Sequence, residues 1–559
     1  MIFFGESVGL SLTLYLSPLL EDVYELSPGC VLWYWIDSHG AKQFITSAGT
    51  TCTSVNWLGG QLGRSHFRQR VFLEDASRPA RRARCLLILG FCLFITGALR
   101  AQTPDPSPTD APQPGARPPL SPFPRYEDWS FLRDPSLRVD PYDRLKFIPL
   151  NDSKTNYLTF GLESRTEFQY LSNNNWGAGP QNPGVVLERL MPDIDLRLGD
   201  HARVFVTLAF DEFTGKYPRP GIDKDNVDGH EGFVEFGSNL HDPHPGWDVI
   251  LGRQEIVLGT GRLLDDNEGV NVRSAFDGVR IGYDKAKGRI DLIAAKPVEI
   301  NPGAWDDIPN PAITLWGLYA SNVRWSSQFM TDVYFLDYDA KSATYGNQTA
   351  REQRRMVGGR YFNRLPGEPP RAGFDYNIET GFQWGTFGNR EIRAWGAGGN
   401  FGWTLPGPVW RMRFGLQTDA ISGDDGQPGT LGTLNALFPR GAYFGPKFAL
   451  IGPANLLSAQ PQFVFHPLLN VTGCLEWIWF WRESTKDALY SFENVPLRPA
   501  NLTSARYIGS QPNLEIRWAI DEHFLAALNL AGFMTGTFLK QSPPSNAIVF
   551  VNVGLTYRF

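Results

Sequence analysis

The sequence has few cysteines, few charged residues and no long apolar run, and each absence excludes a class of protein. Only five cysteines occur in 559 residues, and all but Cys474 precede residue 101, so the body of the chain cannot be an internally disulfide-bonded scaffold. Charged residues make up 20% and the net charge is −6, which is the wrong sign for a nucleic-acid partner. No stretch reaches the length of about eighteen apolar residues that a transmembrane helix needs.

Motifs that catalyse reactions or bind metals are also missing. His230 and Glu231 lack the second histidine of an HExxH zinc site, and the eight histidines are scattered. The GTGRLL stretch at residues 259–264 is not followed by a helical pattern, so it does not resemble a phosphate-binding loop. No GxSxG nucleophile motif is present. We therefore predict no catalytic residue, no metal site, no cofactor and no enzymatic activity.

A secretory signal peptide is predicted at residues 80–101, well inside the chain. The basic stretch RRAR at residues 81–84 precedes the apolar run CLLILGFCLFITGAL at residues 85–99, and the small residue Ala101 follows. A basic region, an apolar core and a small residue follow one another in this order in a signal peptide. Because a signal peptide begins a chain, residues 1–79 are interpreted as an upstream extension from a misplaced start codon.

After this leader, composition divides the chain into three further parts. Residues 102–124 are rich in proline and poor in apolar residues, which predicts an extended linker. Residues 125–156 are predicted to be an N-terminal periplasmic segment. Residues 157–559 have a uniform composition, in which segments of about ten residues alternate in polarity.

The alternation predicts β-strands with one apolar and one polar face. In residues 157–170 (YLTFGLESRTEFQY), Leu158 and Phe160 share one face, whereas Glu163 and Arg165 lie on the other. A repeat of two residues is the pattern of a strand, because successive side chains point to opposite sides of a sheet. The same pattern recurs in PDIDLRLG and in RVFVTLAFD.

Three features favour a transmembrane barrel over a soluble sandwich. The strands run for about ten residues, which is longer than most soluble strands. Their polar faces carry charges of both signs, which suits a wet lumen. Aromatic residues crowd the strand ends, as Trp477, Trp479 and Trp481 do in CLEWIWFWRES, and this suits a lipid interface. We therefore predict an all-β protein: a single antiparallel barrel of about 16–20 strands over residues 157–559, in contact with the lipids of the bacterial outer membrane.

The chain ends on VNVGLTYRF, which completes this pattern. Val553, Leu555, Tyr557 and Phe559 share one parity and are predicted to face lipid. This strand must pair with the first strand, near residues 157–170, because an open sheet edge in lipid leaves backbone groups unpaired. A last strand that alternates and ends on phenylalanine resembles the signal read by the outer-membrane barrel assembly machinery, which is therefore a predicted partner.

Six motifs in chain order carry a family resemblance. They are RYEDWSFLRDPSLRVDPYDRLKFIPL (residues 125–150), LGRQEIVLGTGRLL (251–264), EGVNVRSAFDGVRIGY (268–283), GNREIRAWG (388–396), GTLNALFPRGAYFG (432–445) and IGPANL (451–456). Together they resemble the bacterial alginate export family of outer-membrane proteins. The resemblance implies a monomeric barrel of about eighteen strands. It also implies an arginine-rich, partly acid-paired lumen that passes an anionic, alginate-like polyuronate outward from the periplasm by passive diffusion.

The substrate-binding residues of such a pore are predicted to be arginines on polar faces or in these motifs. Arginine fits a carboxylate with a planar, permanently charged fork, and spaced cations keep each binding step weak enough for a polymer to slide. The predicted cations are Arg165, Arg197, Arg253, Arg262, Arg273, Arg280, Arg393, Arg413, Arg440 and Arg482. The carboxylates predicted to hold or tune them are Glu163, Asp193, Glu255 and Asp419. For any one arginine, neutralising a nearby acid is the alternative, as for Arg253 near Glu255.

Residues 434–445 (LNALFPRGAYFG) predict a loop, because glycine and proline bound them. One interpretation is a loop folded into the pore, with Arg440 in contact with substrate. The other is an external loop.

Two further functions fit the same sequence. An uptake porin for small anions or organic acids would carry the same cations around a narrower opening. A barrel with an enzymatic, structural or adhesive role would not need them. The N-terminal segment also has two interpretations, as a periplasmic lid or as the docking element for a periplasmic export scaffold.

Overall fold

The computed structural model describes residues 117–559, apart from short gaps, and four short strands nearer the N-terminus. The gaps are at residues 182–183, 220, 243–245, 286, 327, 365–370, 408–409 and 442–446. The four short strands lie in a unit of their own, Met1–Gly97, and form two antiparallel pairs: β1 (Tyr24–Glu25) with β4 (Asn56–Trp57), and β2 (Leu32–Ile36) with β3 (Lys42–Thr46). The predicted signal peptide, residues 80–101, and residues 102–116 of the predicted linker lie outside the described residues.

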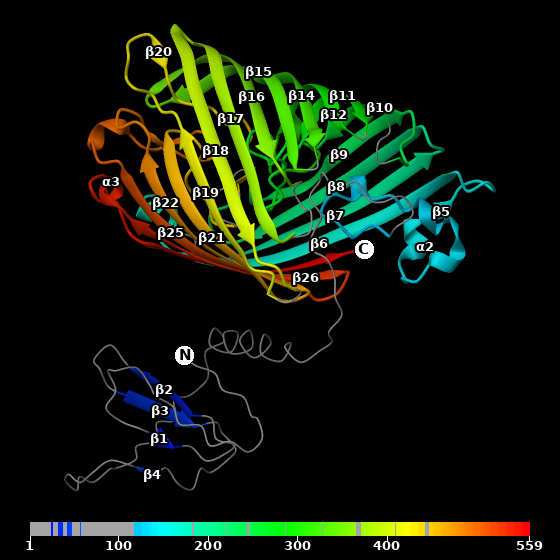
Figure 1. The fold of residues 1–559 in the computed structure, drawn as a ribbon, viewed down its shortest axis with the longest axis horizontal. Helices are drawn as coiled ribbons and strands as arrows, with labels where there is room; N and C mark the ends of the chain where they lie inside the picture. The colour runs from blue at the N-terminus through cyan, green and yellow to red at the C-terminus, as the bar shows by residue number, and fades with distance from the viewer. Residues whose placement is uncertain are drawn as a thin grey trace. The chain divides into compact units, whose positions relative to one another are not determined.

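Eighteen long antiparallel strands of the described chain close into one barrel (Figure 1). They are β6 (Asn156–Leu171), β7 (Val185–Leu198), β8 (Ala202–Thr214), β9 (Asp225–Gly237), β10 (Gly246–Gln254), β11 (Phe276–Lys285), β12 (Gly288–Glu299), β14 (Ile313–Ser326), β15 (Phe329–Tyr345), β16 (Gln348–Phe362), β17 (Gly373–Phe387), β18 (Arg390–Thr404), β19 (Arg413–Ile421), β21 (Leu456–Leu468), β22 (Val471–Arg482), β25 (Tyr507–Ala519), β26 (Phe524–Thr535) and β27 (Ile548–Arg558). The predicted all-β outer-membrane barrel is therefore confirmed, and its strand number lies within the predicted range.

Shorter elements extend the wall or lie in its connections. They are β5 (Ile148–Pro149), β13 (Ile308–Pro309), β20 (Thr430–Leu431), β23 (Leu489–Tyr490), β24 (Pro496–Arg498), the 3-10 turns η5 (Asn174–Gly177) and η7 (Ala500–Leu502), and the helix α3 (Thr537–Lys540). Within the described part of the chain, no helix combines the length and the apolar character needed to cross a membrane.

The last strand closes the ring by pairing with the first. β27 runs antiparallel to β6 from Phe550 opposite Leu171 to Arg558 opposite Glu163. The pairing continues past the strand end, because the Phe559 N–H donates to the Leu162 carbonyl at 3.1 Å and the Leu162 N–H donates back at 3.1 Å. The predicted partnership of the two terminal strands is therefore confirmed.

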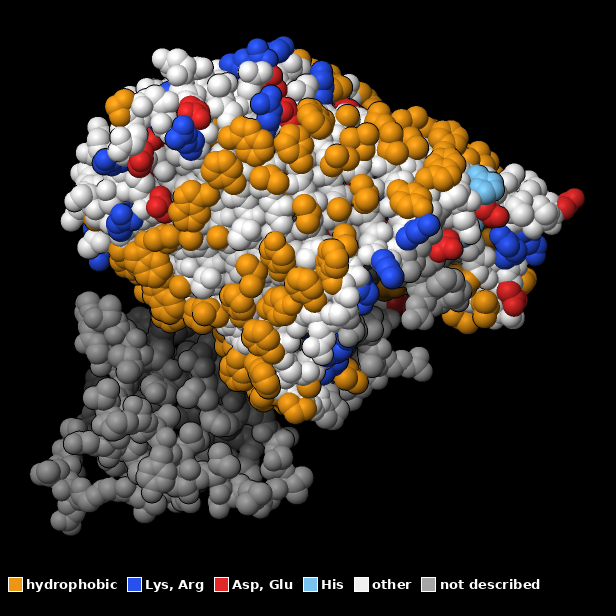
Figure 2. Space-filling view, turned by 45° about the horizontal axis from the view of Figure 1, so that its top comes forward, with side chains coloured by type: hydrophobic (Ala, Val, Ile, Leu, Met, Phe, Trp, Pro, Cys, Tyr) orange, Lys and Arg blue, Asp and Glu red, His pale blue; other side chains and the backbone are white. Residues whose placement is uncertain are grey.

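Side chains alternate between a polar lumen and an apolar exterior. On β6, Glu163 and Arg165 are buried on the inner face, whereas Phe168 on the outer face is 43% exposed. Trp477 is 42% exposed on the outer face of β22, as expected for an aromatic girdle. Figure 2 shows the outward apolar side chains as a broad band, with charged side chains gathered toward its edges. This band is the surface that contacts lipid in the outer membrane.

The two ends of the barrel differ in the length of their connections. At one end the turns are short, such as residues 199–201 between β7 and β8, and the C-terminus lies at this end. The opposite end carries residues 255–275 between β10 and β11, residues 422–455 between β19 and β21, and residues 483–506 between β22 and β25. Since outer-membrane barrels have short periplasmic turns and longer extracellular loops, the first end is periplasmic and the second extracellular.

A segment of residues 117–150 packs at the periplasmic end. It contains the 3-10 turns η2 (Pro124–Tyr126), η3 (Ser130–Arg133) and η4 (Pro135–Leu137) and the short helix α2 (Asp143–Lys146). Trp129, Leu132 and Phe147 of this segment form an apolar cluster with Tyr157 of β6. Phe123 is buried as well, so packed structure begins ahead of the boundary predicted at residue 125.

Aromatic contacts join this segment to the end of the chain. The Tyr142 ring stacks on the Phe559 ring with centroids 4.6 Å apart. The hydroxyl groups of Tyr142 and Tyr557 lie 2.6 Å apart and share a hydrogen bond. The terminal phenylalanine is therefore covered by the segment rather than left facing lipid alone.

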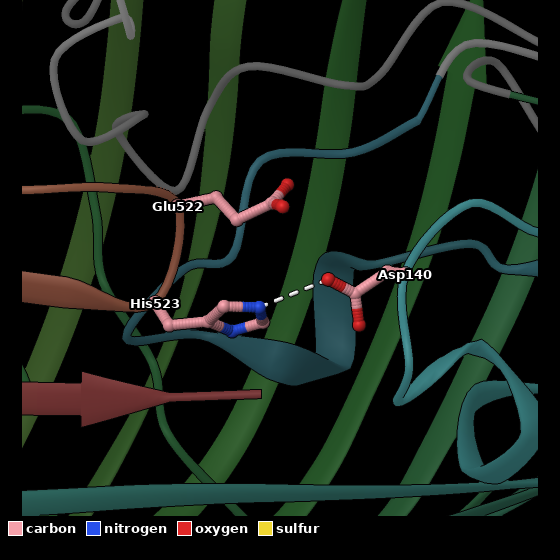
Figure 3. Close-up of side chains that lie close together, drawn as sticks. All are labelled: Asp140, Glu522 and His523. Atoms are coloured by element: carbon pink, nitrogen blue, oxygen red, sulfur yellow. Dashed lines mark hydrogen bonds and ion pairs between the residues drawn. The ribbon is translucent and has the colours of Figure 1, made fainter. Parts of the chain in front are cut away.

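A polar contact fixes the same segment against the β25–β26 turn (Figure 3). Asp140 Oδ2 lies 3.0 Å from His523 Nε2, with Glu522 beside them, and His523 Nδ1 lies 2.7 Å from the Arg558 carbonyl oxygen. Burial alone would raise the pKa of Asp140, but hydrogen bonds from the Tyr142 N–H and from His523 bring it below its usual value. Asp140 is therefore ionised at neutral pH and holds the segment to the turn.

Two extracellular loops fold into the lumen. Residues 255–275 and residues 422–455 meet at a β-bridge between Leu264 and Phe438. Apolar residues of the second loop, including Leu434, pack against inner-face residues of the wall. The lumen is thus occupied by chain as well as lined by the strands.

The loop predicted at residues 434–445 is one of these inward segments. The Asn435 N–H donates to Gln383 Oε1, on the inner face of β17, at 3.0 Å. Arg354 of β16 donates to the Thr433 carbonyl oxygen at 3.1 Å. Of the two interpretations of this loop, the one folded into the pore is therefore correct for residues 434–441, and residues 442–446 lie outside the described residues.

Deleting Phe559 is expected to lower the amount of assembled barrel. The deletion removes both backbone hydrogen bonds to Leu162 and the stacking on Tyr142, each a contact worth roughly 1 kcal/mol. Heat-modifiable migration of the outer-membrane fraction measures the assembled protein. The conductance of the barrels that do assemble should not change.

Phe559→Tyr is the matched control, since it keeps the ring and both backbone bonds. Assembly of this variant at the level of the unmodified chain is expected. Assembly at that level in the deletion variant would contradict the role assigned to Phe559.

Candidate functional site

The lumen contains a compact set of paired charges, which we call the central charge cluster. Each member lies within 4.0 Å of a member of opposite charge. The basic members are Arg125, Arg165, Arg189, Arg273, Lys447 and Arg558, and the acidic members are Glu163, Glu167, Glu231, Glu255, Asp266 and Glu268. The six positive and six negative formal charges cancel when all members are ionised.

Glu163 joins three strands of the wall within this cluster. One of its oxygens lies 2.6 Å from Arg189 Nη2 of β7, and the other lies 2.8 Å from Arg558 Nε of β27. All three side chains are buried. Removing one partner would leave a buried charge unpaired, at a cost of roughly 3–5 kcal/mol. Glu163 therefore stabilises the seam of the barrel as well as lining the lumen.

Glu268, on the inward loop 255–275, is the most exposed carboxylate of the cluster. Its side chain is 29% exposed and lies 3.2 Å from Arg165 Nη1 and 3.1 Å from Arg189 Nη2. Both arginines also donate to the carbonyl oxygens of Glu268 and Val270. Burial opposes ionisation of Glu268, but the two guanidinium groups outweigh it and hold its pKa well below the usual range. The loop thus supplies the acceptors for two lumen arginines.

Glu255 connects the base of the same loop to the N-terminal segment. Its oxygens lie 2.7 Å from Arg273 Nη2 and 2.8 Å from Arg125 Nη2. His230 Nε2 lies 2.7 Å from the same carboxylate, and Arg273 Nη1 donates to the Pro122 carbonyl oxygen at 2.6 Å. The segment 117–150 therefore reaches the cluster from the periplasmic side.

Lys447 brings the second inward loop to the cluster. Its Nζ lies 2.7 Å from Glu167 Oε1 on β6 and donates to the Gly269 carbonyl oxygen of the first loop. Burial lowers the pKa of Lys447, although Glu167 beside it acts in the opposite direction. Ion pairs of the cluster thus join the two loops and the N-terminal segment to the wall.

Arg262 forms a second, smaller charged site on the opposite wall. Its Nη1 donates to Asp419 Oδ1 of β19 at 2.7 Å, and its Nε lies 3.5 Å from Glu379 Oε2 of β17. Ser458 of β21 also donates to Asp419, at 3.0 Å. A small adjoining pocket of about 50 Å³ is lined in part by Tyr334, Met356, Leu434 and Pro453. Arg262 thus lies beside open volume, as does the predicted Arg273, which lines a second pocket with Glu163 and Asp193.

Three other predicted arginines lie near the periplasmic rim, each beside an acid. Arg197 Nε lies 2.9 Å from Asp195, Arg280 Nε lies 2.8 Å from Asp291, and Arg413 Nη2 lies 2.5 Å from Asp375. The predicted carboxylate Asp193 is buried nearby on the inner face of β7. A Cβ at Gly161 would lie 2.2 Å from Asp193 Oδ2, so this close approach requires glycine.

Arg393 lies outside the lumen, contrary to prediction. It shares the parity of the exposed Trp395, and its own side chain is 63% exposed on the outer face of β18. Ile392 and Ala394 take the inner face, where they belong to the same apolar cluster as Leu434 of the inward loop. The inner face of β18 is apolar at this level, where the inward loop packs against it, and Arg393 points outward.

Arg253 is also outside the lumen, contrary to prediction. It shares the outward parity of Leu251 and lies 3.0 Å from Asp277 on the neighbouring strand. Its guanidinium donates to the Asp307 carbonyl oxygen of the β12–β14 loop at 3.2 Å. The predicted alternative, neutralisation of Glu255, is wrong as well, because Arg125 and Arg273 are the partners of Glu255.

Arg482 points inward but is fully buried beneath extracellular chain. Its guanidinium lies 4.1 Å from the Phe538 ring and donates to the carbonyl oxygens of Thr485, Asp487, Ala500, Thr503 and Ala505. It therefore holds the loop 483–506 in place and is not accessible to a substrate. Arg440, by contrast, is exposed on the inward loop, where its N–H donates to the Gly261 carbonyl oxygen at 2.7 Å. Its contact with substrate stays a prediction.

Sequence reasoning missed several members of the central charge cluster. Arg189 has the same inner parity on β7 as Asp193, so the strand pattern could have identified it. Arg125 and Lys447 belong to segments without regular strand periodicity. No local signal marks these two residues.

The chain matches the profile of a known protein family. The profile of the alginate export family matches residues 156–551, which span the barrel from β6 into β27. No curated protein matches the sequence. Solved structures with some similarity include Pseudomonas aeruginosa OccK11 (OpdR), with 11% identity and a TM-score of 0.46 over 72% of this chain and 96% of that chain. They also include Acinetobacter baumannii OccAB1, with 11% identity and a TM-score of 0.46 over 75% and 99% of the two chains.

The family and the closed barrel together establish the class of the protein. The matched residues are well over half of the chain, and the family is one of transport proteins. The protein is therefore a porin-like β-barrel of the bacterial outer membrane and belongs to the alginate export family.

Proposed function

We propose that the protein is a passive, anion-selective channel that exports an acidic polysaccharide, an alginate-like polyuronate, across the outer membrane. The observation that carries this proposal is the charge balance of the central cluster. Lumen arginines are there compensated by carboxylates of the chain itself, and above all by Glu268 on a loop. A polyuronate carries the same functional group on each sugar.

Exchange of carboxylates explains how a polymer would pass a lumen that contains buried charges. A guanidinium that loses its partner in a poorly hydrated site is costly, so an arginine without any acceptor would be unstable. If the loop withdraws as a sugar carboxylate arrives, each guanidinium keeps an acceptor throughout. The net free energy of binding at each step is then the difference between two similar ion pairs. This difference is small, so the polymer can slide.

The loop 255–275 is the proposed gate. Arg165 and Arg189 are bound both to the Glu268 carboxylate and to loop carbonyl oxygens, so moving the loop frees both arginines together. The periplasmic side would admit the chain past Arg197, Arg280 and Arg413. Arg262 and Arg440 would contact it further along.

The remaining partners follow from the two ends of the chain. Barrel assembly machinery is proposed to recognise the β27 strand, and a periplasmic export scaffold is proposed to dock on the segment 125–156. A monomer suffices for transport, since β6 and β27 of one chain close the pore.

Glu268→Gln is expected to increase anion selectivity and block by oligouronates. The variant removes one negative charge from a balanced cluster and weakens the loop contact that competes with substrate. Loss of a charge-assisted hydrogen bond, worth roughly 1.5 kcal/mol, corresponds to about tenfold tighter block. Reversal potentials and oligouronate titrations in planar bilayers measure both effects.

Glu391→Gln is the matched control, because it makes the same charge change on the outer face, where Glu391 lies 2.8 Å from Arg393 and is 57% exposed. No change in selectivity is expected. A cation-selective pore that oligouronates do not block would sink the proposal. Block by monomeric organic acids alone would indicate uptake of small anions instead.

Replacing residues 434–441 with a short glycine–serine linker is expected to raise single-channel conductance severalfold. The reason is that this stretch fills the lumen between β17 and the loop 255–275. A glycine–serine replacement of residues 178–181 of the β6–β7 loop, of which three are exposed, serves as control and should leave conductance unchanged. Equal conductance in both variants would contradict an obstructing role for the inward loop.

A further inference from the structure

Four aspartates meet at the extracellular rim, away from the central charge cluster. Asp225 and Asp228 belong to β9, whereas Asp306 and Asp307 belong to the loop between β12 and β14. One carboxylate oxygen from each lies within 4.8 Å of the corresponding oxygens of the other three. Four negative charges at this spacing repel one another strongly unless something compensates them.

Ion pairs with the described chain do not neutralise these carboxylates. None of the four forms an ion pair with a lysine or arginine of the described residues. The nearby Arg253 guanidinium pairs with Asp277 and donates to carbonyl oxygens of Gly229 and Asp307, not to the carboxylates.

Buried carboxylate oxygens without partners point to a missing ligand. Asp225 is only 2% exposed, and its Oδ1 has no hydrogen-bond partner. Asp211, opposite Asp225 on β8, is fully buried, and both of its oxygens lack partners. A buried ionised carboxylate left unpaired is unfavourable, so such groups are normally paired or bind a metal ion.

Backbone N–H groups of the β12–β14 loop orient one of the four carboxylates, that of Asp228. Asp228 accepts hydrogen bonds from the Trp305 N–H at 3.1 Å and from the Asp307 N–H at 3.3 Å, which orients its oxygens. The loop runs parallel to β9 through a bridge between Val227 and Ala304. Such supporting hydrogen bonds to a carboxylate are typical of metal ligands.

Gly303 lies close to another carboxylate of the group, that of Asp306. A Cβ at Gly303 would lie 2.2 Å from Asp306 Oδ2, so a larger residue would displace that carboxylate. The Asn301 N–H donates to Asp307 Oδ1 at 2.7 Å, which orients that carboxylate as well. Both features belong to a crowded carboxylate group rather than to a solvated acidic surface.

We propose that Asp225, Asp228, Asp306 and Asp307 form a divalent-cation site that takes Ca²⁺ and fastens the β12–β14 loop to the rim of the barrel. The ligands are all hard oxygens, which suit Ca²⁺ and Mg²⁺ and not the softer metals. Ca²⁺ is favoured because carboxylates from a strand and a loop form an irregular, adaptable shell, whereas Mg²⁺ demands near-octahedral geometry and keeps its waters. The site goes beyond the proposed export function and does not depend on it.

Isothermal titration of the chelator-washed, full-length barrel in detergent with CaCl₂ and with MgCl₂ tests the site. One saturable Ca²⁺ per chain is expected, with Mg²⁺ binding at least about tenfold more weakly. Asp225→Asn should weaken Ca²⁺ binding at least about tenfold. Saturating Ca²⁺ should also raise the midpoint of thermal unfolding of the unmodified barrel but not of this variant.

The double variant Asp337→Asn, Asp339→Asn is the matched control. It removes two carboxylates from the outer face, where arginines already pair with them, so Ca²⁺ binding should be retained. Heat-modifiable migration checks that each variant folds. Asp306→Asn, at an exposed position, provides the same test if Asp225→Asn does not fold. Absence of saturable Ca²⁺ binding to the folded barrel, or unchanged binding in Asp225→Asn and Asp306→Asn, would overturn the proposal.

Discussion

The pairing of β27 with β6 is the constraint on which the rest of the barrel depends. An unpaired strand edge in lipid leaves backbone N–H and carbonyl groups without partners, so the sheet has to close. The register that closes it places Arg558 opposite Glu163, which also binds Arg189 of the next strand. A shift by one residue would turn these charges toward lipid. Backbone closure and lumen electrostatics are therefore specified together.

Loops and the N-terminal segment occupy the interior of this barrel, and this affects how the positive charges of its arginines are compensated. In a wide, wet pore a cation can be compensated by water and mobile ions. Here two loops and the N-terminal segment exclude much of that water, so the chain has to supply its own counter-charges. The resulting network holds the closed arrangement together. It also makes the fixed arginines sensitive to any soluble carboxylate that can replace Glu268.

Strand periodicity predicted the wall well, because a side chain on a strand has only two directions. The inward position of Arg165 followed from that alternation. Arg393 was wrongly predicted to face the lumen. The residues that take the inner face there contact a loop distant in sequence, and the alternation along one strand does not reveal such a contact. Arg125 and Lys447 lie in segments without a period, so only tertiary contacts position them. The four aspartates of the rim come from residues about eighty positions apart, and no local motif joins them.

The stacking of Tyr142 on Phe559 has a consequence for the order of folding events. The surface on which the N-terminal segment docks is made by His523, Tyr557 and Phe559, which are among the last residues of the chain. The docking surface is therefore incomplete until the final strand is in place. The N-terminal segment would therefore dock at the periplasmic end only after β27 has paired with β6 and the barrel has closed.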